Sequence, residues 1–244
     1  MSAGARRVSA IVKKELLEYR RNRFILGTTV VLPAIFLAVP LVNLFSISGS
    51  TSTSAVRALA ESAQLMMLIV PITLPTAIAA YSVIGERDQA TLEPLLTTPV
   101  TERELIVGKA IAAIVPAVII AYALAAAFGV AVRIQDNPVV VSTVFDSSRI
   151  VAEVLFAPLL AAWATWVAMA VSTRSGDVRV AQQLSTLGSL PMLGLTALFT
   201  FGVLTPSVPL AVVLAVALLV VDSLAWRFVT ALFDRERLVS RYGS

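Results

Sequence analysis

The chain has 244 residues, of which 58% are hydrophobic and only 14% are charged, and its formal net charge is +4. Soluble domains carry about a quarter charged residues, so this composition excludes an ordinary soluble domain. The sequence has no Cys and no His, which excludes a disulfide framework and removes the commonest general base and metal ligand.

The first predicted element is an amphipathic helix within residues 1–23. Apolar and aromatic residues recur here at helical spacing, while most charged side chains fall on other faces. The recurring residues are Val8, Ile11, Val12, Leu16 and Tyr19. This pattern predicts a helix that lies at the inner membrane interface with its cations toward anionic headgroups. The same cations also act as an orientation signal, and the two interpretations are compatible.

Long apolar runs predict an all-α membrane protein with six transmembrane helices, because a spanning helix needs roughly 20 apolar residues. Residues 180–221 carry no charge, and as one helix they would be about twice as long as a bilayer core is thick. This stretch therefore forms a hairpin, with turn residues at 202–209. The predicted single domain covers residues 24–228, with spans at about 24–47, 62–85, 110–132, 150–173, 180–201 and 207–228.

The distribution of basic residues predicts the orientation. Among the 19 Lys and Arg residues, only Arg57, Arg133 and Arg149 fall on the side opposite to the termini. This asymmetry predicts a multi-pass protein of the cell (inner, cytoplasmic) membrane, with both termini and a tail of residues 229–244 in the cytoplasm. The lipid bilayer is thus an expected partner, and nucleic acid is not. No large outer domain is expected.

Residues 86–109 form a polar loop between the second and third predicted spans. Thr101 and Glu104 match a capping box, which predicts the start of the helix that continues into the third span. Pro94 suits the first turn of a short helix at about residues 93–98. The loop is therefore more structured than a simple connector needs to be.

Leu92, Leu95 and Leu96 form an apolar knob with charged neighbours in this loop. An apolar centre with a polar rim is typical of a docking surface. Alternatively, the leucines pack back on the inner ends of the spans. The residues alone leave both interpretations open.

The segment GERDQATLEPLLTTPVTERELIVGK, at residues 85–109, resembles the signature loop of the ABC-2 type permeases, which are membrane subunits of many ABC exporters. Six spans, cytoplasmic termini and the N-terminal helix agree with that family, and residues 181–191 resemble its fifth span. The motif elements present in the loop are Glu86-Arg87, Thr91-Leu92-Glu93, Leu95-Leu96, Thr98-Pro99, Arg103-Glu104 and Gly108-Lys109.

The resemblance implies a permease subunit of an ABC exporter that forms the translocation path as a dimer, with a second copy or a paralogue. It also implies a short cytoplasmic coupling helix in the loop, on which a separate ABC ATPase subunit docks. The implied docking residues are Glu86, Arg87, Thr91, Leu92, Glu93, Leu95, Leu96, Thr98 and Pro99.

Nucleotide chemistry is expected on the partner and not on this chain. The sole Gly-Lys pair, Gly108-Lys109, lacks the spacing and the following Ser or Thr of a P-loop. We therefore expect ATP and magnesium on the ATPase subunit, and no cofactor, catalytic residue or metal site here.

Two ionisable residues, Glu153 and Asp222, fall inside predicted spans, where such residues are costly. Each either contacts a substrate or ion, or forms a buried hydrogen bond. For Asp222 the predicted partner is Arg227 or Arg174. We favour the buried hydrogen bond for both carboxylates.

Small residues at 181, 185 and 189 predict a close-packing helix face or, alternatively, part of the path. Gln182 and Gln183 lie beside this stripe. Uncharged segments at 139–145 and 202–209 are expected to dip into the outer leaflet. The candidate path residues are thus Glu153, Gln182, Gln183 and Asp222.

Three other functions are alternatives. An ion-gradient-driven secondary transporter predicts inverted repeats and interrupted helices, and no repeat is visible between residues 24–132 and 150–228. A membrane enzyme needs a cluster of nucleophile, base or metal ligands, which the sequence lacks. A complex that transmits force without carrying cargo is a variant of the ABC interpretation.

Overall fold

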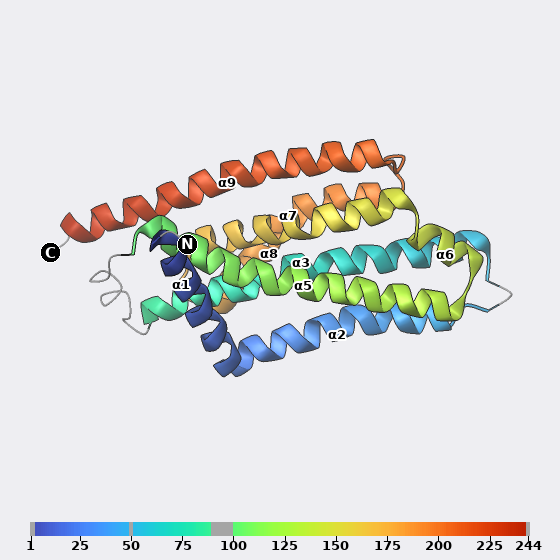
Figure 1. Cartoon of the computed structure of the whole chain (residues 1–244), viewed down its shortest axis with the longest axis horizontal. Coiled ribbons are helices and arrows are strands. Elements are labelled where there is room, and N and C mark those ends of the chain that lie inside the picture. Colours follow the sequence, from blue (N-terminus) through green and yellow to red (C-terminus); the bar gives the residue numbers. More distant parts are fainter. Residues whose placement is uncertain (1–2, 49–50, 89–99, 243–244) are drawn as a thin grey trace.

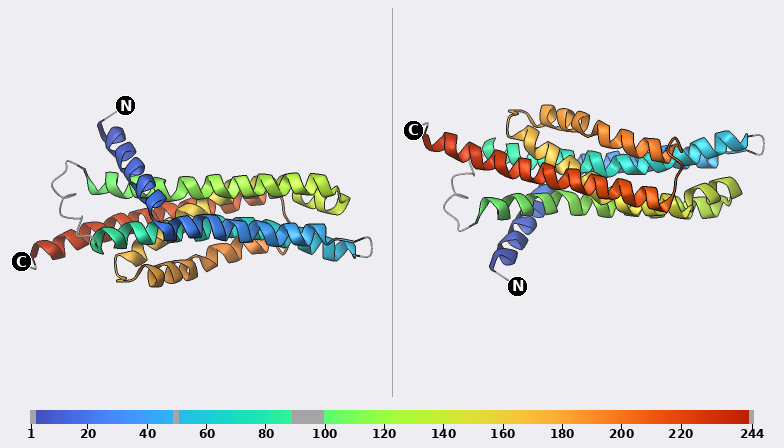
Figure 2. Two further views of the ribbon diagram at one scale, coloured as in Figure 1. Left: turned by 90° about the horizontal axis from the view of Figure 1, so that it is seen from below. Right: turned by 90° about the horizontal axis from the view of Figure 1, so that it is seen from above.

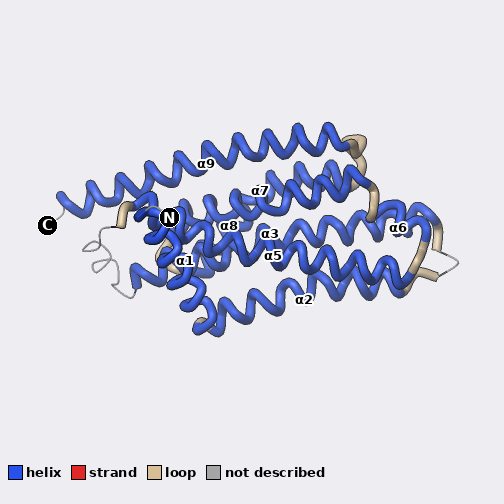
Figure 3. Tube along the Cα trace, viewed as in Figure 1, coloured by secondary structure: helices blue, strands red, loops and turns tan. Residues whose placement is uncertain are grey.

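The computed structural model describes residues 3–48, 51–88 and 100–242 (Figure 1). Over these residues the chain forms eight α-helices and no strand (Figure 3), which confirms the all-α prediction. The helices are α1 (Ala3–Arg21), α2 (Arg23–Phe45), α3 (Thr53–Asp88), α5 (Glu102–Gln135), α6 (Pro138–Val144), α7 (Ser147–Ser172), α8 (Val178–Thr200) and α9 (Val208–Tyr242).

The long helices α2, α3, α5, α7, α8 and α9 run side by side, and α1 crosses them at a steep angle (Figures 1 and 2). Helix α3 packs against α7, and both contact α8. Helix α9 packs on α7, and α2 packs on α3 and α5. The short helix α6 lies at one end of this bundle and α1 toward the other (Figure 1). We call these the α6 end and the α1 end.

Five helices of the described chain are long and apolar enough to cross a membrane, and they correspond to five of the six predicted spans. The remaining predicted span, α8, has 23 residues but is not among them. Its first turns carry Gln182 and Gln183, and serines, threonines and glycines follow. Composition alone therefore does not confirm six spans, although α8 packs beside α3 and α7 within the bundle.

Helices α3 and α9 extend well beyond the predicted spans. Helix α3 begins at Thr53 instead of about residue 62, and α9 continues to Tyr242 instead of ending near residue 228. Charged residues such as Arg57 and Glu61 end an apolar run, but they do not end a helix, because the backbone hydrogen bonds continue through them. Apolar runs therefore mark the membrane-embedded part of a helix and not its full length.

The capping box at the start of α5 is confirmed. The Thr101 side chain accepts from the Glu104 backbone N–H at 3.3 Å, and the Thr101 N–H donates to Glu104 Oε2 at 2.9 Å. The hairpin turn is confirmed as well, since α8 ends at Thr200 and α9 begins at Val208. Gly202 in this turn has a φ of 69°, a left-handed conformation that glycine adopts without steric cost.

Helix α6 was not predicted, because its residues were expected to form an uncharged segment that dips into the outer leaflet. The Asn137 side chain accepts from the Val139 and Val140 backbone N–H groups, and Pro138 occupies the first turn. Asn at the cap followed by Pro is a strong helix-start signal. Val140 packs in a core with residues of α2, α3 and α5, so the bundle holds α6 in place.

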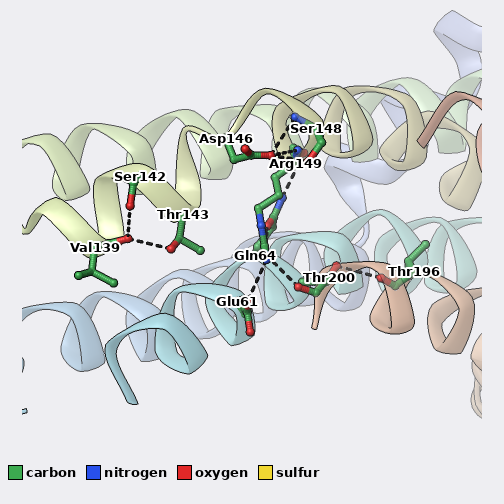
Figure 4. A network of polar contacts seen from close by, with 10 residues as sticks. All are labelled: Glu61, Gln64, Val139, Ser142, Thr143, Asp146, Ser148, Arg149, Thr196 and Thr200. Atoms are coloured by element: carbon green, nitrogen blue, oxygen red, sulfur yellow. Dashed lines mark hydrogen bonds and ion pairs between the residues drawn. The ribbon is translucent and has the colours of Figure 1, made fainter. Parts of the chain in front are cut away.

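A polar network ties α3, α7 and α8 together at the α6 end (Figure 4). Arg149 Nη2 of α7 lies 2.8 Å from Glu61 Oε1 of α3. Arg149 Nη1 donates to Gln64 Oε1 of α3 at 3.3 Å and to the Thr200 carbonyl of α8 at 2.9 Å. The Gln64 amide in turn donates to the Arg149 carbonyl at 3.1 Å. One guanidinium thus joins three helices.

Asp146 caps α7 beside this network. Its carboxylate accepts from the Ser148 hydroxyl and from the backbone N–H groups of Ser148 and Arg149. The Ser148 hydroxyl hydrogen bond, followed by those backbone bonds, lowers the pKa of Asp146 despite partial burial. An ionised carboxylate at this position also interacts favourably with the helix dipole.

Candidate functional site

A buried polar cluster joins α1, α3 and α5 at the α1 end. Lys109 Nζ donates to Glu15 Oε1 at 2.9 Å, to Ser82 Oγ at 2.8 Å and to the Ser82 carbonyl at 3.1 Å. Glu15 Oε2 accepts from Ser82 Oγ at 2.7 Å and from the Tyr19 hydroxyl at 3.2 Å. We call Glu15, Tyr19, Ser82 and Lys109 the Glu15 cluster.

The Glu15 cluster is an ion pair held away from water. The side chains of Glu15 and Lys109 are only 1% and 4% exposed. Burial by itself would raise the pKa of Glu15, but the Lys109 ammonium and the hydrogen bonds from Lys109 and Ser82 outweigh it, so the pKa lies below its ordinary value. Burial, followed by the Glu15 carboxylate, raises the pKa of Tyr19 well above 10. The Tyr19 hydroxyl therefore remains a hydrogen-bond donor.

The sequence places Glu15 on the inward face of α1. The buried residues of α1 are Ile11, Glu15 and Tyr19, which recur every four positions and so share one helix face. Ser82 lies on α3, which precedes residues 89–99 in the chain, and Lys109 lies on α5, which follows them. The Glu15 cluster therefore fastens α1 to both helices that flank this segment.

Gly108 allows α1 to approach α5 closely. A Cβ atom at Gly108 would lie 2.6 Å from Ile11 Cγ2 and 2.8 Å from Ile11 Cβ, closer than such atoms pack. A second contact, nearer the start of α1, joins Arg7 Nη1 to Glu104 Oε2 at 3.2 Å. Glu104 thus serves the capping box and the α1 contact together.

Gly108→Ala is expected to lower the free energy of unfolding by about 1–3 kcal/mol, because overpacking forces Ile11 and α1 to shift. Thermal unfolding of the purified protein in detergent measures the effect. Gly27→Ala is the matched control, since a Cβ at Gly27 has no neighbour within 4 Å. Equal melting temperatures for the two variants would contradict the close approach of α1 and α5.

Most of the residues predicted to dock an ATPase lie outside the described ranges, and for the others only the backbone is described. Glu86 and Arg87 fall in the last turn of α3, but their side chains are not described. The predicted short helix at 93–98 is also outside the described ranges, so these assignments stay predictions. The remaining predicted docking residues, all within 89–99, are Thr91, Leu92, Glu93, Leu95, Leu96, Thr98 and Pro99.

The candidate path residues lie on three helices and do not form one cluster. Glu153 lies near the start of α7, at the α6 end, whereas Gln182 and Gln183 lie near the start of α8, at the α1 end. Asp222 lies on α9. Glu153 and Asp222 are 9% and 7% exposed, and neither carboxylate has a hydrogen-bond partner among the described residues. The buried hydrogen bond predicted for each of these two carboxylates is therefore absent among the described residues.

The small-residue stripe of α8 is a packing face. Ser185 and Ser189 are fully buried, and their hydroxyls donate to the Ala181 and Ser185 carbonyls of the same helix. Trp163 Nε1 of α7 donates to the Gly188 carbonyl at 3.3 Å. The structure thus favours close helix packing for this face.

The sequence interpretation missed most of the Glu15 cluster. Lys109 was identified only as part of a motif, and Glu15, Tyr19 and Ser82 were not assigned a polar role. A signal was present, because Glu15 is a charged residue centred on an apolar helix face between Ile11 and Tyr19. A charge in such a position is buried only when it is paired.

The comparisons with known proteins identify a family for the chain. The sequence model of a family described as ABC-2 family transporter protein matches residues 9–234, which include every residue of the Glu15 cluster. A search of curated proteins finds no match. A family match over nearly the whole chain, together with several apolar helices of spanning length, leads to one conclusion. The chain belongs to the ABC-2 family of transporter proteins and is a multi-pass membrane subunit of an ABC transporter.

Proposed function

We propose that this chain is the permease of an ABC exporter, driven by a separate ATPase subunit that docks on residues 86–99. The observation that carries the proposal is the Glu15 cluster, which fastens α1 to the two helices flanking that segment. ATP and magnesium are then bound by the ATPase, and this chain supplies the path.

The Glu15 cluster gives a route for force. A partner that moves residues 89–99 acts on the ends of α3 and α5, which Ser82 and Lys109 hold to one carboxylate of α1. Helix α3 also packs against α7 and α8. Closure of two ATPase subunits would therefore shift α1, α3 and α5 together and bias a two-state bundle between inward-open and outward-open forms.

The α1 end is the cytoplasmic end in this proposal. At the α6 end the basic residues are Arg57, Arg133 and Arg149. Arg149 is paired with Glu61, and the Arg133 guanidinium carbon lies 4.2 Å from the Phe145 ring centroid. The remaining Lys and Arg residues fall at the other end or in its loops, the distribution expected for cytoplasmic termini.

A second permease copy or a paralogue is proposed to cover the outward face of α8. In the described chain Gln183 is exposed on α8 while the opposite, small-residue face is buried against the bundle. An exposed amide is costly in contact with lipid tails. A dimer would place Gln183 beside a partner or an aqueous path, and α8 would then complete six spans per chain.

Leu95→Asp and Glu93→Lys are each expected to abolish ATP-driven activity while the protein still inserts into membranes. The first places a charge in the predicted apolar anchor, and the second reverses a charge on its rim. The measurement begins with co-purification of the chain from its native host and identification of the bound ATPase. ATP hydrolysis by the reconstituted complex and ATPase retention on the permease then report the effect.

Arg179→Glu is the control for charge reversal at the same end, because Arg179 is exposed in the first turn of α8. This variant is expected to retain the ATPase. If both loop variants hydrolyse ATP and keep the ATPase like the unmodified complex, the docking assignment is wrong. Solute movement by the chain alone, without any ATPase, would instead support a gradient-driven transporter.

A further inference from the structure

A cavity of about 320 Å³ lies at the α6 end between α3, α5, α6 and α7. Its walls are mainly apolar and aromatic, and include Met67, Tyr122, Phe128 and Phe145. Glu153 also lines it. The cavity is thus a concave, mostly apolar space with few polar groups, the usual character of a small-molecule site.

Glu153 is the polar group of this cavity that lacks a partner. Its residue is 9% exposed, and neither carboxylate oxygen has a hydrogen-bond partner within the described chain. Arg149 also lines the cavity, but its guanidinium is engaged by Glu61, Gln64 and the Thr200 carbonyl. A buried carboxylate is costly unless it is paired, so a cation in the cavity would supply what Glu153 lacks.

The aromatic walls favour an organic cation. Tyr122, Phe128 and Phe145 line the cavity. The Phe145 ring already has the Arg133 guanidinium carbon 4.2 Å from its centroid, so Tyr122 and Phe128 supply the remaining aromatic surface that can attract a cation that has lost its water. The Tyr122 hydroxyl donates to the Val154 carbonyl at 2.7 Å, so its hydrogen is directed away from Glu153. No group of three His, Cys, Asp or Glu residues that could hold a metal occurs in the described part of the chain. A poorly hydrated cation with an apolar body fits these walls better than a metal ion.

The rim of the cavity reaches the outside of the bundle. Ile150 and Val154 line it, and both are exposed on α7. In a membrane-spanning chain that surface meets lipid, where amphipathic cations accumulate. We therefore propose that this cavity binds organic monocations with an apolar body, with Glu153 as the counter-ion. Binding in this cavity requires no ATPase, so the binding test is independent of the proposed coupling to an ATPase.

Tetraphenylphosphonium is a suitable probe, and tetraphenylborate is its matched anion of nearly the same shape. Equilibrium dialysis against the full chain in phosphatidylcholine nanodiscs, corrected for empty nanodiscs, measures saturable binding. We expect the phosphonium to bind and the borate not to bind. Glu153→Gln is expected to weaken phosphonium binding by about tenfold or more, because the charge interaction is lost.

Two further variants separate charge from folding and from surface electrostatics. Ala125→Phe fills the cavity without changing charge, since Ala125 lines it, and is expected to reduce binding as well. Asp136→Asn removes an exposed carboxylate outside the cavity lining at the same end and is expected to leave binding unchanged. Thermal unfolding confirms that each variant is folded.

Several outcomes would overturn the proposal. They are the absence of saturable phosphonium binding to the unmodified chain, equal binding by Glu153→Gln, and equal binding of the borate. The last result would identify an apolar site, such as one for a lipid tail, in which Glu153 has no role. Loss of binding in Asp136→Asn to the same extent as in Glu153→Gln would assign the effect to general surface charge.

Discussion

We expect Lys109→Met to lower the free energy of unfolding by about 3–5 kcal/mol, because removing one partner of a buried ion pair costs about that much. Met fills much of the volume of the Lys side chain but removes the buried cation, so the Glu15 carboxylate keeps only the more distant and partly exposed Lys14 ammonium nearby. Glu15 is only 1% exposed, so water cannot replace Lys109. Unfolding of the purified chain in detergent, by heat or by sodium dodecyl sulfate, measures the loss.

Lys14→Met is the matched control for this prediction. Lys14 Nζ lies 3.7 Å from the same Glu15 oxygen, but its side chain is 44% exposed. Exposed ion pairs contribute about 0–1 kcal/mol, so the control should unfold almost like the unmodified chain. If the two variants lose equal stability, burial of the Glu15 cluster is not what stabilises the α1 end.

The double variant Glu15→Leu with Lys109→Met separates stability from force transmission. Replacing a buried ion pair by apolar residues is often neutral or stabilising, so most of the stability should return. If the Glu15 cluster transmits movement of residues 89–99 to α1, ATP-driven activity should remain impaired in this stable variant. Full activity there would limit the Glu15 cluster to a structural role.

Arg149→Ala is expected to have the second large effect, also about 3–5 kcal/mol. The substitution leaves Glu61 without its cation, and the Glu61 side chain is only 13% exposed. It also removes the donor to the Thr200 carbonyl at the end of α8. The same unfolding assay applies, and protease protection of the α6 end would report loosening of α8.

Arg57→Ala tests whether the loss is specific to the network. Arg57 lies at the same end on α3 but is exposed, and a surface substitution of this kind usually stays within about 0.5 kcal/mol. The double variant Glu61→Gln with Arg149→Met should regain part of the stability, because neither charge remains. An Arg149→Ala protein as stable as Arg57→Ala would contradict the network's role.

Much of the fold could be predicted because membrane spans depend on composition over long stretches. The five apolar spans, the turn before Val208 and the capping box at Thr101 all follow from local patterns. Helix ends outside the membrane could not be found in this way. The first turns of α3 contain Arg57 and Glu61, and only the pairing of Glu61 with Arg149 of α7 explains why a charge is tolerated there.

The candidate site was harder to predict because its members are distant in sequence. Glu15, Ser82 and Lys109 meet only after α1 has packed across α3 and α5, with Gly108 permitting the approach. A sequence shows that Glu15 lies on an apolar face but not which cation reaches it. The cavity beside Glu153 similarly depends on α6, whose Asn137-Pro138 start signal was present but not used.

The modest hydropathy of α8 has a consequence for biogenesis. A helix that does not meet the apolarity criterion for a span is poorly recognised by the insertion machinery when it emerges alone. Its buried partners, α3 and α7, precede it in the chain, and α9 follows after a short turn. In the proposed six-span arrangement, nascent α8 should therefore enter the bilayer by packing on α3 and α7, and substitutions that disrupt those contacts should leave α8 accessible from the ribosome-facing side.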